Sequence, residues 1–171
     1  NPLEMNHSFV RDNPKAIIKN SSQGYSSSKN GFKEAGDLGA SYGAGGIYTT
    51  VGDLAKWMNN FDKATLGGEK LITRLVTQDT LNNGDTLSYG LGIGVSEYKG
   101  LKQYSHGGAD IAHRAFISYF PEIKCGTIVL SNFANFPIGN ISEELNKAFL
   151  SEYLEVEEKD ESIPEVVKVP L

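Results

Sequence analysis

A histidine followed by two glycines, His106-Gly107-Gly108, is the part of this 171-residue chain that is best suited to chemistry. Imidazole changes its charge near neutral pH, so a histidine can polarise or protonate a reacting group. The glycines carry no side chain that would obstruct a substrate approaching the backbone. A histidine alone is more often structural than catalytic, so the glycine pair and its surroundings must carry the catalytic interpretation.

Two short patterns imitate a serine nucleophile. Residues 26–29 have the spacing Ser-x-x-Lys, but an Asn-Gly turn follows instead of an apolar helical repeat, which predicts a solvated loop. Residues 39–43 have the Gly-x-Ser-x-Gly spacing of α/β-hydrolases, and Ser41, Asp85 and His106 follow the Ser, Asp, His order. That motif needs a strand before it and a helix directly after it, whereas here a loop precedes and glycines follow. An α/β-hydrolase that uses Ser41 is therefore a minor alternative.

Three helices are expected to surround these segments. The first spans about 51–60, because Thr50 is an N-cap residue and Asp53 stands at the capping-box position. A second, short helix over 71–76 ends before a cluster of Asn, Gly and Asp turn residues. Asn140 is expected to cap the third helix. Its apolar residues should face the sheet, and they are Ile141, Leu145, Ala148 and Phe149.

Period-two alternation predicts the strands. Residues 89–97 place apolar side chains on one face, and three glycines leave the other face open to a close neighbour. Further strands are expected through Tyr104 into the glycine pair, at 115–120 and at 126–131, and their short connections predict an antiparallel meander. Residues 1–39 show no period and predict an extended surface loop. The expected fold class is therefore α+β, a sheet with helices packed on its faces.

Composition excludes several functions. The net charge of -5 and the pI near 5.2 argue against a nucleic-acid partner. No apolar stretch approaches the roughly 20 residues that cross a bilayer, so no membrane span is expected. The single cysteine, Cys125, and three histidines without close spacing predict neither a metal site nor another cofactor.

Several motifs occur in an order that resembles one known family. Residues 42–50 read Tyr-Gly-Ala-Gly-Gly-Ile-Tyr-Thr-Thr, and Asp-Leu-Ala-Lys-Trp follows at 53–57. Tyr-Gly-Leu-Gly at 89–92, His-Gly-Gly at 106–108, and a Pro-Glu turn between strands come next. This layout resembles the second half of serine β-lactamase-related proteins, which include class C β-lactamases, penicillin-binding DD-peptidases and esterases. The resemblance covers about residues 1–150 and implies the C-terminal part of an αβα sandwich.

The resemblance also implies site residues. The family carries a Lys-Thr-Gly or His-Thr/Gly-Gly box on an edge strand beside the active site, where an extended substrate can pair. His106 matches the cationic or hydrogen-bonding position, and Gly107 and Gly108 match the positions without bulk. Ala109 matches the residue whose backbone N–H helps form the oxyanion hole, an effect of about 3 kcal/mol per donor. Tyr25 resembles a tyrosine in the cleft wall of the class C relatives. Gly107 stands where the family often has a hydroxyl residue, which weakens the case for efficient β-lactam turnover.

The expected function is therefore part of a serine hydrolase that acts by acyl transfer on an amide, an ester or a β-lactam. The family's Ser-x-x-Lys pair and Tyr-x-Asn lie upstream of the matched region, and the chain begins at Asn1 without a Met. The chain is thus expected to come from a longer protein, to lack the nucleophile and to be inactive alone. Its expected partners are the upstream half of the same domain and a small-molecule or peptide substrate. A non-catalytic domain that binds peptide or peptidoglycan is the second hypothesis.

Two segments are expected along the chain. Residues 1–154 form the C-terminal portion of a β-lactamase-like domain, and residues 155–171 form an acidic tail or linker. Missing strands would leave a sheet edge exposed, through which the chain could form a homo-oligomer. The resemblance implies a periplasmic or extracellular location for the parent protein.

Overall fold

The computed structural model describes residues 2–36, 43–151 and 153 of the chain, so Ser41 and the segment 155–171 lie outside the described residues. Its centre is an antiparallel sheet of four strands, in which neighbours in space are also neighbours in sequence. The strands are β5 (Gly94–Tyr98), β6 (Leu101–Asp110), β7 (His113–Phe120) and β8 (Cys125–Ser131). The predicted α+β fold class and antiparallel meander are confirmed.

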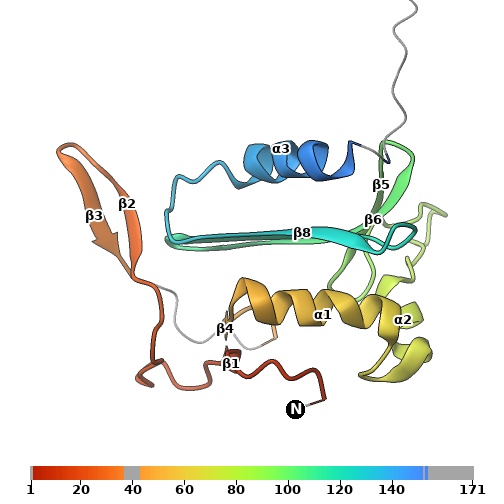
Figure 1. Cartoon of the computed structure of the whole chain (residues 1–171), viewed down its shortest axis with the longest axis horizontal. Coiled ribbons are helices and arrows are strands. Elements are labelled where there is room, and N and C mark those ends of the chain that lie inside the picture. The colour runs from red at the N-terminus through yellow and green to blue at the C-terminus, as the bar shows by residue number, and fades with distance from the viewer. Residues whose placement is uncertain (1, 37–42, 152, 154–171) are drawn as a thin grey trace, which may run out of the picture.

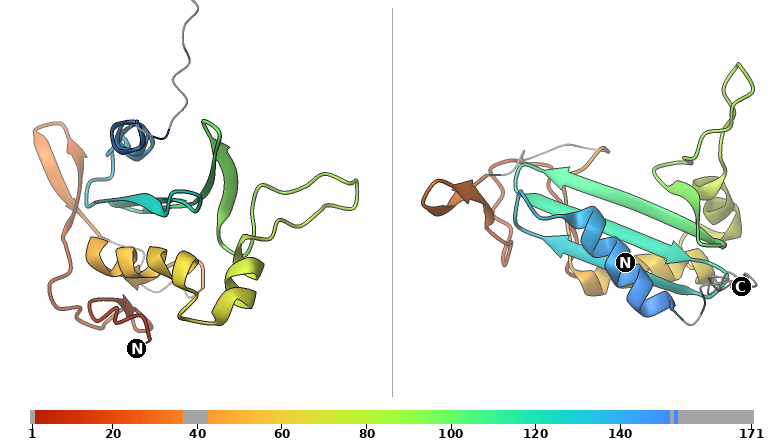
Figure 2. Two further views of the ribbon diagram at one scale, coloured as in Figure 1. Left: turned by 45° about the vertical axis from the view of Figure 1, so that its right-hand side comes forward. Right: turned by 90° about the horizontal axis from the view of Figure 1, so that it is seen from above.

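Three helices accompany the sheet, and two of them cover its opposite faces (Figure 1). The helices are α1 (Val51–Lys63), α2 (Gly68–Val76) and α3 (Ile138–Leu150). α1 lies below the sheet in Figure 1 and α3 lies above it, and the right-hand view of Figure 2 shows α3 across the strands. The sheet, α1 and α3 therefore form the three layers of a sandwich.

The first helix begins at the predicted cap. The Thr50 hydroxyl accepts a hydrogen bond from the Asp53 N–H at 3.2 Å. The buried Asp53 carboxylate accepts hydrogen bonds from the His7 N–H at 2.7 Å and the Ser8 hydroxyl at 2.9 Å. Burial raises the pKa of Asp53, but these bonds and the Lys56 ammonium outweigh burial and hold the pKa below its ordinary value of 3.8. Asp53 thus joins the N-terminal segment to α1.

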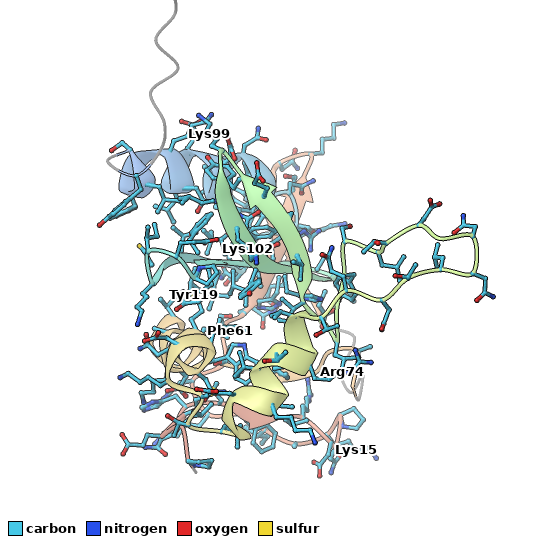
Figure 3. All side chains as sticks on the ribbon, turned by 90° about the vertical axis from the view of Figure 1, so that its right-hand side faces the viewer. Lys15, Phe61, Arg74, Lys99, Lys102 and Tyr119 are labelled. Carbon is cyan, nitrogen blue, oxygen red and sulfur yellow. The ribbon has the colours of Figure 1, made fainter. Side chains whose placement is uncertain are left out.

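Aromatic side chains fill the space between α1 and the sheet. Phe61 of α1 lies against Tyr119 of β7 (Figure 3), and the two rings stack with centroids 5.6 Å apart. Phe61 also contacts Tyr104 of β6, with ring centroids 5.6 Å apart. Each such pair contributes about 0.5–1.5 kcal/mol beyond the burial of its area. Gly126 lets the helix approach β8, because a Cβ there would lie 2.4 Å from the Met58 side chain. This face of the sheet is therefore an apolar interface.

The interface between α3 and the opposite face is more polar. α3 buries Ser142, Asn146 and Leu150, whereas Ile141 and Phe149 remain 40% and 65% exposed. The prediction that the apolar residues of α3 face the sheet was wrong for these two residues and for the exposed alanine beside Phe149. The physical reason is that the sheet presents hydroxyl groups to this helix.

Those groups form a polar layer, which we define as Ser96, Gln103, Ser118, Thr127 and Asn146. Thr127 donates to the Asn146 Oδ1 at 2.6 Å, and the Asn146 Nδ2 donates to the Ser118 hydroxyl at 3.5 Å. Gln103 donates to the same hydroxyl at 3.1 Å and accepts from the Ser96 hydroxyl at 3.2 Å. The polar layer therefore connects all four strands of the sheet to α3.

The start of α3 also differs from the prediction. The helix begins at Ile138 and Pro137 occupies the N-cap position, so Asn140 lies inside the helix and does not cap it. Proline suits the start of a helix because its φ is already restricted and it has no N–H to leave unpaired. Pro137, and not Asn140, therefore marks the start of α3.

The N-terminal residues contain strands that the sequence did not predict. β2 (Gly24–Ser28) and β3 (Gly31–Ala35) form an antiparallel hairpin, and β1 (Phe9–Val10) pairs with β4 (Ile47–Tyr48). The expected loop over 1–39 is therefore wrong for these segments. Figure 1 shows the hairpin beside one end of the sheet, where the Tyr25 N–H donates to the Asn132 carbonyl at 2.8 Å. Contacts far apart in sequence, rather than local alternation, hold this hairpin.

The predicted strand over 89–97 is a turn followed by β5. Gly92 has a φ of +78°, and the Gly90 N–H donates to the Ile93 carbonyl at 2.8 Å, which folds the chain back before the strand begins. The close neighbour predicted from the glycines is confirmed. A Cβ on Gly90 would lie 2.2 Å from the Leu75 carbonyl of α2.

Candidate active site

An open edge of β6 defines the candidate site. β5 pairs with β6 only over Leu101–Ser105, whereas β7 pairs with β6 over Tyr104–Asp110. Within the described residues, one edge of 106–110 therefore has no strand beside it. Unpaired backbone groups on such an edge can hydrogen-bond an extended ligand.

The residues on this open edge are exposed and small. His106, Gly107, Gly108 and Ala109 are all exposed to solvent. A Cβ on Gly107 would lie 3.3 Å from the ring of Phe116, which is tight, whereas one on Gly108 would be at an ordinary 3.5 Å from its nearest neighbour. The glycines therefore leave the surface beside His106 low enough for a ligand to reach the backbone.

His106 is held by a residue that the predictions did not include. Its Nε2 lies 2.9 Å from the Tyr89 hydroxyl, and the two ring centroids are 6.1 Å apart. Residues 77–93 connect α2 to β5 and project from the body (Figure 2). Tyr89 belongs to this segment and forms an isolated bridge with Gly94, the first residue of β5. The sequence signal for it was an aromatic residue directly before a glycine turn.

Tyr104 lies two residues before His106, so both side chains are on the α1 face of β6. Burial, with a smaller contribution from the Glu122 carboxylate, raises the pKa of Tyr104. Tyr104 is therefore an uncharged phenol near neutral pH and belongs to the aromatic interface with α1. It supports the strand that carries His106.

The structure places Tyr25 in the β2–β3 hairpin, where it forms an isolated bridge with Phe133. The Tyr25 backbone accepts a hydrogen bond from the Ala134 N–H at 2.8 Å, which places it beside the end of β8. The neighbouring glycine packs at the β6–β7 turn, because its Cβ would lie 2.6 Å from the Cβ of Ala112. Ser26 pairs with Lys33 in the hairpin and Lys29 lies in its turn, so the Ser-x-x-Lys pattern is in a hairpin and not on a helix.

The second histidine of the sheet, His113, lies at this same turn. Its Nε2 is 3.1 Å from the Ser22 hydroxyl. In the part of the chain that the structure describes, no group of three or more His, Cys, Asp or Glu side chains is placed to hold a metal ion. None of the described helices combines the length and the apolar character of a bilayer-spanning segment.

Comparison with known proteins identifies the architecture. The model of the beta-lactamase family matches residues 1–145. No curated protein matches this chain. A penicillin-binding protein homologue from Pyrococcus abyssi, described as octameric, is 24% identical with a TM-score of 0.72, over 88% of this chain and 35% of that chain.

Two further solved structures have the same architecture. A penicillin-binding protein from Bacillus halodurans is 22% identical with a TM-score of 0.66, over 84% of this chain and 46% of that chain. A D-amino acid amidase from Ochrobactrum anthropi, in complex with D-phenylalanine, is 17% identical with a TM-score of 0.64, over 88% of this chain and 50% of that chain. Such identities show a shared fold. The chain spans half or less of the length of these three solved structures.

Proposed function

Because this chain belongs to the beta-lactamase family, we propose that it forms part of a serine hydrolase that transfers an acyl group from an amide, an ester or a β-lactam to water. The observation that carries the proposal is the open edge of β6, where the exposed His106 adjoins two glycines and an unpaired backbone. An extended substrate can bind there as an additional strand. The amidase with the shared fold has been solved in complex with D-phenylalanine and with L-phenylalanine amide, which favours a small amide among the candidate substrates.

Each residue of the edge has a proposed role. A serine oxygen attacks the substrate carbonyl carbon, and the negative charge that develops on the carbonyl oxygen is stabilised by the Ala109 N–H. His106 exchanges a hydrogen bond or a proton with the reacting group. Gly107 and Gly108 leave space for the substrate backbone. The bond between the carbonyl carbon and the leaving group breaks, and the leaving group takes up the proton that the serine hydroxyl lost. Water then attacks the acyl-serine ester, which releases the acyl group as an acid and returns a proton to the serine oxygen.

The proposed nucleophile comes from the upstream half of the domain, which acts as the partner of these 171 residues. The matched structures are about two to three times as long as the region aligned here, which supports a second half. Ser26 lies on a hairpin strand, where no helix holds a lysine against it. The 171 residues alone are therefore proposed to be inactive.

The test is intact-mass spectrometry and hydrolysis with a nitrophenyl ester and a penicillin. The 171 residues alone should show no adduct. A longer protein that also contains the upstream half, called the longer product below, should form one. His106→Ala in the longer product should lower kcat/KM about 100-fold, and Lys29→Ala in the hairpin is the matched control. An adduct on Ser26 or Ser41 of the short chain would contradict the proposal and, for Ser41, favour the α/β-hydrolase alternative.

A binding function without catalysis is the second candidate, because an open strand edge can pair with a peptide whether or not a nucleophile is present. A peptidoglycan-like peptide should then perturb the amide signals of 106–109 while its mass stays unchanged. Turnover of that peptide by the longer product would reject this candidate.

The open edge also supports a proposal of self-association, because unpaired strand edges on two copies can pair with one another. Sedimentation velocity should then show dimers that dissociate on dilution. A single monomeric species at high protein concentration would reject this proposal.

A further inference from the structure

We propose that Tyr89 is a positioning residue for His106, whose phenol occupies Nε2 and so determines that Nδ1 is the ring nitrogen presented to a substrate. The proposal rests on the proposed function of the open edge. Its first step concerns only the imidazole, however, and can be measured without any hydrolytic activity.

The geometry of the pair is that of a direct hydrogen bond. The Tyr89 oxygen and the His106 Nε2 are 2.9 Å apart, within the ordinary range for such bonds. His106 is exposed at the end of the β5–β6 pairing, where a side chain without a partner would sample several rotamers. Among the described residues, Tyr89 is the residue that hydrogen-bonds the His106 ring, and it does so at Nε2. Nδ1 therefore remains available to a ligand.

Tyr89 can hold another side chain because its own backbone is fixed. The next two residues are held by backbone hydrogen bonds. The Gly90 N–H donates to the Ile93 carbonyl at 2.8 Å, and the Leu91 N–H donates to a carbonyl of α2 at 2.9 Å. Ile93 and Val95 are 6% and 8% exposed, so the start of β5 is part of the core. A tyrosine has only two side-chain torsions to restrict. The phenol is therefore held from a hydrogen-bonded turn that adjoins the core.

The direction of the bond follows from the chemistry of the phenol. A phenolic oxygen shares its lone pair with the ring, so the hydroxyl is a better donor than acceptor. Tyr89 then donates to Nε2, and the neutral imidazole of His106 carries its proton on Nδ1. The atom offered at the open edge is an N–H donor, which suits a carbonyl or carboxylate oxygen of the substrate.

The first test is nitrogen NMR of the 171-residue chain labelled with 15N-histidine, at a pH where the ring is neutral. Wild-type His106 should show an unprotonated Nε2 and a protonated Nδ1. Tyr89→Phe should move both signals towards the mixture of tautomers found in water, whereas Tyr98→Phe on β5 should leave them unchanged. The signals of His7 and His113 report whether each variant remains folded.

Two results would overturn the proposal. One is a wild-type His106 that is protonated on Nε2, which is decisive even if no variant folds. The other is a folded Tyr89→Phe whose His106 signals match those of the wild type.

The second test is a double-mutant cycle on kcat/KM in the longer product with the upstream half. Tyr89→Phe should lower kcat/KM about 2- to 10-fold, the value of one neutral hydrogen bond. His106→Ala should lower it about 100-fold, and the double variant should be no slower than His106→Ala. An undiminished Tyr89→Phe effect in the His106→Ala background would overturn the positioning role. If the longer product hydrolyses nothing, the proposed function fails and the NMR result still decides the role of Tyr89.

Discussion

Thr127→Val tests whether the polar layer stabilises the attachment of α3. Valine keeps the shape of threonine but removes the hydroxyl that donates to the Asn146 Oδ1 at 2.6 Å. Thr127 is 6% exposed and Asn146 is 2% exposed, so water cannot readily replace the lost donor. A buried acceptor left unpaired costs about 1–3 kcal/mol. We expect the free energy of unfolding to fall by that amount.

The double variant Thr127→Val/Asn146→Leu should recover part of the loss. Replacing both partners by apolar groups leaves no unpaired group between them, and such exchanges are close to neutral. Ser118 loses the Asn146 donor at 3.5 Å but keeps the Gln103 donor at 3.1 Å. The double variant should therefore be more stable than the sum of the two single changes predicts, by about 1–2 kcal/mol.

Urea unfolding, followed through the fluorescence of the single tryptophan, measures these differences. With a slope of about 2 kcal/mol per molar urea, the Thr127→Val midpoint should fall by about 0.5–1.5 M. Thr86→Val at an exposed position is the matched control and should stay within about 0.5 kcal/mol of wild type. A loss below about 0.5 kcal/mol for Thr127→Val would refute the reasoning. So would a double variant whose loss equals the sum of the losses of the two single variants.

Three further predictions concern other parts of the fold. The lowered pKa of Asp53 stabilises the folded state above about pH 4, and this stabilisation is lost as the pH falls through the folded pKa. The difference in urea midpoint between wild type and Asp53→Asn should therefore shrink from pH 7 to pH 3. A difference that stays constant would contradict this prediction. Gly90→Ala should lower the free energy of unfolding by about 1–3 kcal/mol, because its Cβ would meet a carbonyl at 2.2 Å, and Gly108→Ala should be nearly neutral in the same urea assay. Leu150→Ala should cost about 2–5 kcal/mol because Leu150 is fully buried, whereas Phe149→Ala at 65% exposure should cost far less; equal costs would disagree with the observed face of α3.

Elements whose ends are set by nearby residues could be predicted from the sequence. Thr50 and Asp53 form the expected cap of α1, and the predicted strand at 126–131 matches β8 within one residue. In both cases the information lies in a few consecutive residues, either as a side chain that bonds a nearby backbone group or as an apolar alternation. The order of the strands in the meander follows from the short turns between them.

Elements held by distant partners could not be predicted in the same way. The β2–β3 hairpin depends on bonds from Tyr25 to residues 132–134, more than a hundred positions away. The buried face of α3 depends on hydroxyls that the sheet places opposite Asn146. The contact between Tyr89 and His106 likewise joins a turn to a strand through the fold, so the sequence suggested only His106.

The polar layer also has a consequence for how the molecule opens. The polar side chains between α3 and the sheet fix the register of the helix, because sliding the helix by a turn would leave Asn146 facing the wrong hydroxyls. The interface between α3 and the sheet therefore depends on hydrogen bonds of fixed geometry, in contrast to the aromatic interface under α1. We expect the amides of α3 to exchange with solvent through local detachment, earlier than those of β7, which stays paired on both sides.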